Sequence, residues 1–130
     1  MARILLLDDS PMQTLCMQRQ LLGLGHEVCH VGMLSEALGL VSAGADLEKE
    51  PVDLALVELT MLQDNGFDVG LCLLRAGVSK VLLLSGVRRE TDDIWARALG
   101  LQGVLSRPLT AQRLGARLVD VLTGGRHDVP

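Results

Sequence analysis

The sequence lacks a long hydrophobic segment, a basic stripe and any closely spaced pair of cysteines. Its longest apolar runs are about four residues, whereas a membrane-spanning helix needs roughly 20. The N-terminus opens directly into an apolar strand pattern, so we expect no signal peptide. Because the net charge is -4 and no basic arm is present, binding to nucleic acid is also disfavoured. We therefore expect a protein that contacts neither nucleic acid nor membrane.

The three cysteines, Cys16, Cys29 and Cys72, lie far apart in the sequence. This spacing matches neither a disulfide framework nor a metal-binding motif. Free thiols of this kind are typical of the reducing cytoplasm, where we place the chain, and buried cysteine behaves as a small hydrophobic residue. We expect all three to fill the core.

A chain of 130 residues with 48% hydrophobic and 22% charged residues is long enough for one water-soluble domain with a real core. No internal repeat, low-complexity block or long linker divides it. We predict one domain over residues 1–123 and a short flexible tail over residues 124–130.

Short runs that are apolar on both faces recur at residues 4–7, 54–57, 81–84 and 104–105. Such runs are typical of central strands in a parallel sheet that helices cover on both sides. Residues 26–31 are less apolar and fit an edge strand. Residues 42–50 are polar and acidic, which predicts a surface loop.

Segments with helical spacing separate these strands. An early stripe runs along Met12, Leu15, Cys16, Arg19 and Leu22, and a late one along Leu114, Leu118, Val121 and Leu122. Pro11 suits a first helical position, and Thr110 can cap the last helix. Alternating strands and helices predict an α/β fold: a doubly wound, five-stranded parallel sheet in the flavodoxin-like order 2-1-3-4-5.

Polar side chains follow the strands at their carboxyl ends, where the active groups of such sheets gather. Asp8 and Asp9 follow the first strand, Glu58 the third, Ser85 the fourth and Arg107 the fifth. The sequence therefore predicts one site at this edge of the sheet.

The order and spacing of these residues resemble the response-regulator receiver domain of bacterial two-component signalling. The resemblance covers residues 2–123 and rests on Leu7-Asp8-Asp9-Ser10, Glu58 after an apolar strand, Gly66 eight residues later, Ser85, and Leu105-Ser106-Arg107-Pro108. Residues 1–5 and 91–95 look most similar to the single-domain regulators of twitching-motility and chemotaxis systems.

The resemblance implies the following roles. An acidic pair and an acceptor aspartate hold Mg²⁺, and a hydroxyl and a lysine bind the phosphate. An aromatic ring on the fifth strand turns inward on phosphorylation and transmits the change. Here Glu58 stands for the aspartate and Arg107 for the lysine. Val104 occupies the place of the aromatic switch, and Leu62 that of a proline in the loop after the third strand.

The longer side chain of Glu58 alters the geometry of phosphoryl transfer. One added methylene moves the carboxylate by about 1.5 Å, and roughly 1 Å of misplacement can cost about 100-fold in rate. Because a guanidinium prefers flat, two-pronged pairing with a carboxylate, Arg107 could bind Glu58 directly. We predict an ion pair between them that partly stands in for the phosphorylated state.

Several carboxylates in one pocket repel one another, so Mg²⁺, a proton or Arg107 must relieve them. Weak Mg²⁺ binding at Asp9 and Glu58 is therefore possible, and no other cofactor is expected. In a simpler interpretation, Asp8 and Asp9 only cap the first helix. Ser85 could likewise be a turn residue.

We expect a stand-alone, atypical receiver that acts by protein binding, without phosphorylation and not as an enzyme. The resemblance implies a sensor histidine kinase, a chemotaxis-type protein or a pilus motor protein as partner. The face built from the fourth helix, fifth strand and fifth helix is the expected contact and could also form a homodimer. Trp95 on the fourth helix is either core or an exposed anchor, Phe67 is expected in the core, and His26, His30 and His127 are expected to be solvated or structural.

Two alternatives stay open. In the first, Glu58 or Asp9 still accepts a phosphoryl group with Mg²⁺. In the second, the chain is a flavodoxin-like cofactor binder, which the chemistry disfavours because Asp8 and Asp9 would repel a cofactor phosphate where such proteins offer free N–H groups.

Overall fold

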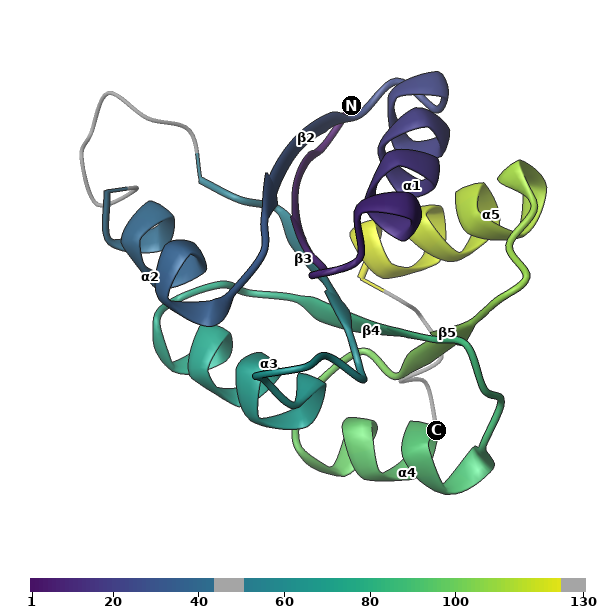
Figure 1. Ribbon diagram of the computed structural model, residues 1–130. Coiled ribbons are helices and arrows are strands. Elements are labelled where there is room, and N and C mark those ends of the chain that lie inside the picture. Colours follow the sequence, from purple (N-terminus) through teal and green to yellow (C-terminus); the bar gives the residue numbers. More distant parts are fainter. Residues whose placement is uncertain (44–50, 125–130) are drawn as a thin grey trace.

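The computed structural model of the protein describes residues 1–43 and 51–124. In that part of the chain, strands and helices alternate from end to end (Figure 1). Their bounds are β1 Arg3–Leu7, α1 Pro11–Gly23, β2 Glu27–Val31, α2 Leu34–Ala43, β3 Leu54–Glu58, α3 Gly66–Arg75, β4 Val81–Ser85, α4 Glu90–Ala98, β5 Val104–Ser106 and α5 Ala111–Leu122.

The strands form one parallel sheet in the order β2-β1-β3-β4-β5. Helices α1 and α5 cover one face, and α2, α3 and α4 cover the other (Figure 1). The predicted fold and strand order are therefore confirmed. The same carboxyl edge of the sheet carries the residues that follow β1, β3, β4 and β5.

Each face of the sheet packs its own hydrophobic cluster, because successive side chains of a strand point to opposite sides. In β1, Leu5 and Leu7 pack on the side of α2, α3 and α4, and Ile4 and Leu6 on the side of α1 and α5. All residues of β3 and β4 are buried. This rigid centre holds the strand ends in place.

The helix ends follow the predicted capping pattern. Pro11 opens α1, whose N-cap is Ser10, and the hydroxyl of Thr110 accepts a hydrogen bond from the Arg113 N–H at 3.0 Å. Inside α3, a Cβ atom at Gly70 would lie 2.8 Å from the Leu101 side chain. A larger residue at position 70 would therefore require the Leu101 side chain to move.

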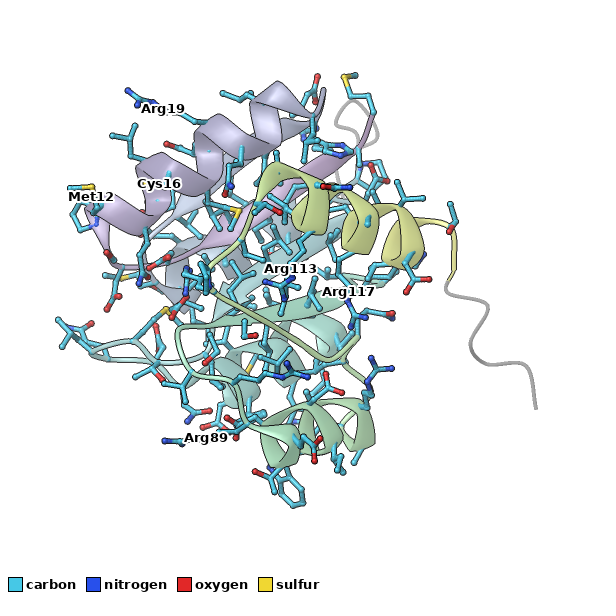
Figure 2. The ribbon with its side chains drawn as sticks, turned by 90° about the vertical axis from the view of Figure 1, so that its right-hand side faces the viewer. Met12, Cys16, Arg19, Arg89, Arg113 and Arg117 are labelled. Atoms are coloured by element: carbon cyan, nitrogen blue, oxygen red, sulfur yellow. The ribbon has the colours of Figure 1, made fainter. Side chains whose placement is uncertain are left out.

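The predicted inner stripe of α1 is wrong. Its apolar members are exposed on the outer side of the helix, as Met12 and Cys16 show in Figure 2, and the buried residues are Thr14, Met17 and Leu21. Both sets have helical spacing, and packing against the sheet selects the second. The hydroxyl of Thr14 lies 3.3 Å from His30 Nε2, so this polar group on the inner face has a partner.

The cysteine prediction holds only in part. All three thiols are free, with Cys29 and Cys72 half-buried and Cys16 exposed, so Cys16 does not fill the core. Of the loop predicted over residues 42–50, positions 42 and 43 belong to α2, and residues 44–50 lie outside the described part, as do residues 125–130 of the predicted tail and His127. Phe67 packs half-buried against the core. No helix within residues 1–43 and 51–124 has the length and apolar character to cross a membrane.

Candidate functional site

The residues predicted at the strand ends gather at one edge of the sheet. Asp8 follows β1, Glu58 ends β3 and Arg107 follows β5. The start of α3 lies very close to the backbone that follows Glu58. Glycine is required at position 66, because a Cβ atom there would lie 2.6 Å from the Cα atom of Leu59. We call the cluster of Asp8, Asp9 and Glu58 with Arg107 the acid pocket.

Glu58 and Arg107 form the centre of the acid pocket. The Arg107 guanidinium donates a hydrogen bond to Glu58 Oε2 at 2.7 Å. The Glu58 side chain is 7% exposed and that of Arg107 20%, so water screens the pair only weakly. The predicted ion pair is present.

Asp8 lies almost fully buried beside this pair. Its Oδ1 accepts a hydrogen bond from the Ser10 N–H at 2.9 Å. Its Oδ2 has no hydrogen-bond partner and lies 3.7 Å from the Arg107 guanidinium. The N-cap of α1 is Ser10, whose hydroxyl accepts from the Gln13 N–H at 3.3 Å, and Asp8 contacts the N–H of Ser10 itself. Arg107 thus serves two carboxylates at once.

Asp9 is exposed and takes its partner from the loop after β3. Its Oδ2 accepts a hydrogen bond from the Leu62 N–H at 2.8 Å. A proline at position 62, as the resemblance implies for the family, has no N–H to donate. The leucine therefore supplies a donor that holds Asp9 on the protein itself.

Burial sets the titration of the two inner carboxylates. Burial raises the pKa of Glu58 above its ordinary value of 4.5, and the hydrogen bond and charge of Arg107 offset only part of this rise. Burial likewise raises the pKa of Asp8, against the Ser10 N–H and the Arg107 charge. Both groups are therefore easier to protonate in the folded chain than in the unfolded one.

Ser85 and Val104 make hydrogen bonds that fix the backbone around the acid pocket. The buried hydroxyl of Ser85 donates to the carbonyl oxygen of Val87 at 2.9 Å and accepts from the Val87 N–H at 3.1 Å, as a turn serine does. The Val104 N–H donates to Asp93 Oδ1 at 2.8 Å. Helix α4 is thereby tied to β5 at the position where an aromatic switch was expected.

The magnesium ion that the receiver resemblance implies does not fit this arrangement. Glu58 Oε2 binds Arg107, Asp9 Oδ2 binds the Leu62 N–H, and Asp8 Oδ2 faces the same guanidinium. Across residues 1–43 and 51–124, no three His, Cys, Asp or Glu side chains are placed to hold a metal ion. At Asp9 and Glu58 these internal partners take the place of an ion, so a divalent ion would first have to displace Arg107 from Glu58.

Solved structures with the same fold are receiver domains. A response-regulator receiver domain protein from Clostridium thermocellum matches with a TM-score of 0.81 and 22% identity over 95% of each chain. Chemotaxis protein CheY4 of Vibrio cholerae matches with a TM-score of 0.79 and 22% identity over 93% of this chain and 98% of that one. The receiver domain of Francisella response regulator 1452 gives 0.78 and 17%, over 95% and 98%. The chain therefore has the fold of a response-regulator receiver domain.

One curated protein is also similar to the chain in sequence. Protein PilH of Pseudomonas aeruginosa is 27% identical over 127 residues, which cover 95% of this chain and all of PilH, and is a homologue. No family model matches the chain. The resemblance to receivers is thus confirmed.

Sequence reasoning missed two features of the surface. The first is the Leu62 N–H, since the loop path that aims it at Asp9 is not visible in the sequence. The second is a group of five arginines that line one cavity of about 660 Å³ beside β5, although no basic stripe was found in the sequence: Arg88, Arg89, Arg97, Arg113 and Arg117. The neighbours Arg88 and Arg89, and the one-turn spacing of Arg113 and Arg117, were the available signals.

Proposed function

We propose that the chain is a receiver-type signalling module that acts by binding a partner protein and does not use phosphoryl transfer at position 58. The observation that carries this proposal is the 2.7 Å hydrogen bond between Arg107 and Glu58. This bond occupies both Glu58, at the position of the phosphate acceptor, and Arg107, at the position of the residue that binds the phosphate. On this view the chain is not an enzyme and works in the cytoplasm, which suits its free cysteines.

The charge of the pair supports a single, fixed state. The Glu58 carboxylate carries one negative charge, whereas a phosphoryl group supplies nearly two and three acceptor oxygens. Arg107 bound to Glu58 is therefore a partial copy of the phosphorylated arrangement. Mg²⁺ or phosphate would have to compete with a bond already made inside the protein.

Two further contacts support the fixed state. The Ser85 hydroxyl holds the start of the loop between β4 and α4 through Val87, and Asp93 holds α4 against β5 through the Val104 N–H. A valine cannot swing between buried and exposed positions as an aromatic ring can. We infer that α4 stays in one position.

The face made by α4, β5 and α5 is the proposed contact surface. On α4, Ile94 is 66% exposed and Trp95 59%, which favours the anchor interpretation of Trp95 over the core. Exposed tryptophan is enriched at binding hot spots. The proposed partner is a sensor histidine kinase, a chemotaxis-type protein or a pilus motor protein, and a second copy of the chain could use the same face.

Treatment with acetyl phosphate or beryllofluoride in the presence of Mg²⁺ tests the proposal. We expect no added phosphoryl group by intact-mass measurement and no saturable change in the fluorescence of Trp95, the only tryptophan. The matched control is the triple variant Glu58→Asp, Arg107→Lys, Leu62→Pro, which restores the receiver residues and should respond. If the unchanged chain takes up phosphate on Glu58 or Asp9, the phosphorylatable alternative is correct.

A further inference from the structure

A groove of about 500 Å³ lies between α1 and the segment that follows β5, and we call it the α1 groove. Met12, Cys16 and Met17 line it from α1, and Pro108 and Leu109 line it from the other side. Cavities of about 300–1,000 Å³ with mainly apolar walls are the usual binding sites of small molecules. The α1 groove shares no lining residue with the cavity beside β5.

The wall that α1 contributes is apolar and open to solvent. Met12 is 71% exposed and Cys16 is exposed, and Figure 2 shows both on the outer side of the helix. Met17 is buried and belongs to the core beneath them. Methionine side chains are flexible and polarizable, so they adapt to apolar ligands of irregular shape. This wall is suited to an alkyl chain.

One uncompensated positive charge borders the α1 groove. The charged residues among its described lining are Arg19 and Arg107, and none of them is acidic. Arg107 is bound to Glu58 and lies near Asp8, so its charge is already shared between two carboxylates. Arg19 is exposed and forms no hydrogen bond or ion pair with the described residues. A ligand with one negative charge and an apolar chain complements this combination.

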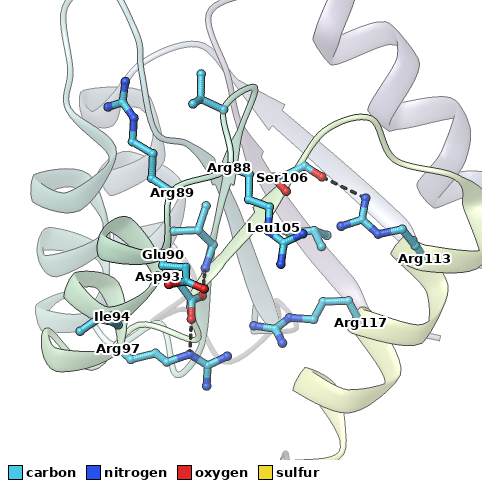
Figure 3. A pocket seen from close by; sticks show the side chains of 12 residues that line it. Arg88, Arg89, Glu90, Asp93, Ile94, Arg97, Leu105, Ser106, Arg113 and Arg117 are labelled. Atoms are coloured by element: carbon cyan, nitrogen blue, oxygen red, sulfur yellow. Dashed lines mark hydrogen bonds and ion pairs between the residues drawn. The ribbon is translucent and has the colours of Figure 1, made fainter.

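The cavity beside β5 has a different composition, which Figure 3 shows. Its lining includes the carboxylates of Glu90 and Asp93, and Arg97 Nε donates to Asp93 at 2.9 Å. Several charges of both signs are therefore close together there. The α1 groove instead combines a single free cation with thioether, thiol and aliphatic side chains.

A hydrogen bond across the α1 groove limits what can enter it. Gln20 Nε2 donates to the carbonyl oxygen of Leu109 at 2.9 Å and so joins α1 directly to the opposite wall. A helix with its side chains is about 10–12 Å wide, and it could not lie along a groove whose walls are bridged in this way. A single alkyl chain is narrow enough to fit beside the bridge.

We propose that the α1 groove binds an amphipathic monocarboxylate of the fatty-acid class. Its carboxylate binds the Arg19 guanidinium, which can offer two parallel hydrogen bonds to such a group. Its alkyl chain lies along Met12, Cys16 and Leu109. This inference goes beyond the proposed function and does not depend on it, because it concerns a small ligand at α1 rather than the partner protein or the acid pocket.

Titration with octanoate tests the inference, followed by calorimetry and by the amide chemical shifts of the protein. We expect saturable binding with the largest shifts in α1 and at Leu109. Octan-1-ol has the same chain length without the charge, and butyrate has the charge with a shorter chain. Each should bind at least about tenfold more weakly than octanoate, because each lacks one of the two matching features.

A matched pair of arginine variants tests the contact with the carboxylate. Arg19→Gln should weaken octanoate binding at least about tenfold, because it removes the charge that faces the ligand. The control Arg75→Gln makes the same change at an exposed arginine on α3, which covers the other face of the sheet, and should leave the affinity unchanged. Neither arginine is buried, so the helical circular dichroism of both variants should stay normal.

A second matched pair tests the place of the alkyl chain. Cys16→Phe puts a ring into the α1 groove and should weaken octanoate binding at least about tenfold, because the ring takes the space of the chain. Leu15→Phe adds a ring to the neighbouring position, which is 46% exposed and does not line the groove, and should leave the affinity unchanged. Thermal unfolding of the two variants shows whether both remain folded.

Absence of saturable binding, equal binding of octanoate and octan-1-ol, or equal effects within either pair of variants would overturn the inference. Tighter binding of an amphipathic helical peptide than of octanoate, with the same dependence on Cys16→Phe, would assign the groove to a protein contact instead. Uptake of phosphate by the chain would overturn the proposed function alone, since octanoate binding is measured without phosphate donors.

Discussion

The acid pocket differs in how its charges are paired from the cavity beside β5 that five arginines line, which we call the arginine cleft: Arg88, Arg89, Arg97, Arg113 and Arg117. In the acid pocket, each carboxylate has a donor or cation inside the protein: Arg107 serves Glu58 and Asp8, and the Leu62 N–H serves Asp9. In the cleft, Arg88, Arg113 and Arg117 form no ion pair with a carboxylate of the described residues, and backbone carbonyl oxygens orient Arg113 and Arg117.

The two regions correspond to the input site and the proposed contact surface of a signalling switch. Groups that are already bound to each other respond poorly to metal or phosphate, because the internal bond must first be broken. Groups whose charge is uncompensated gain most from a partner of opposite charge. On the proposed function, the acid pocket offers no free acceptor for a chemical input, while the arginine cleft offers a strongly charged surface for contact.

Arg107→Ala should have the largest effect and would break the comparison at the acid pocket. It leaves Glu58 and Asp8 buried without their cation, so we expect the free energy of unfolding at neutral pH to fall by about 3 kcal/mol in urea denaturation. Arg107→Lys keeps a positive charge and should lose much less. A loss no greater than that of an exposed arginine would mean that the pocket is not closed by this ion pair.

Acidification should stabilise the folded state of the unchanged chain through Glu58 and Asp8. Burial raises the pKa of Glu58 and Asp8 in the folded state above the ordinary values of 4.5 and 3.8. Their contribution to stability is therefore complete below the unfolded pKa values and is lost as pH rises through the folded ones. We expect Glu58→Gln to flatten the fall in unfolding free energy between acidic and neutral pH, measured by urea titrations across that range. An unchanged slope would remove Glu58 as its source.

Leu62→Pro sharpens the comparison at the edge of the pocket. The substitution removes the N–H that Asp9 accepts, and we expect it to lower the free energy of unfolding by about 1 kcal/mol. Leu62→Ala retains the N–H and serves as the control, since the leucine side chain is 95% exposed. Equal losses in the two variants would show that the hydrogen bond contributes nothing.

Arg97→Ala should have the smallest effect. Arg97 and Asp93 form an exposed pair one helical turn apart, with side chains 43% and 36% exposed. Such pairs contribute about 0.3–0.5 kcal/mol, so thermal unfolding should change little. A loss comparable to that of Arg107→Ala would show that the two charge arrangements do not differ in the way described.

Sequence pattern predicted the sheet and the acid pocket because both depend on strong, local signals. Runs that are apolar on both faces specify buried parallel strands, and residues after such strands must meet at one edge. The pairing of Glu58 with Arg107 followed from their positions at that edge and from the preference of guanidinium for carboxylate.

Helix faces and loops were harder to predict for physical reasons. Helix α1 has apolar residues at helical spacing on both sides, and only contact with the sheet decides that Met17 is buried and Met12 exposed. The arginine cleft draws on the loop before α4, on α4 itself and on α5, so its charge density arises only when these elements pack together. The hydrogen bond from Leu62 depends on a loop path that side-chain patterns do not encode.

The contact between Leu62 and Asp9 has a consequence for how this protein can change over time. Because the donor belongs to the main chain, every residue type except proline can supply it, and the exposed leucine side chain takes no part. Position 62 can therefore accept many substitutions while the bond persists, and proline is the one residue there that would free Asp9 from this donor.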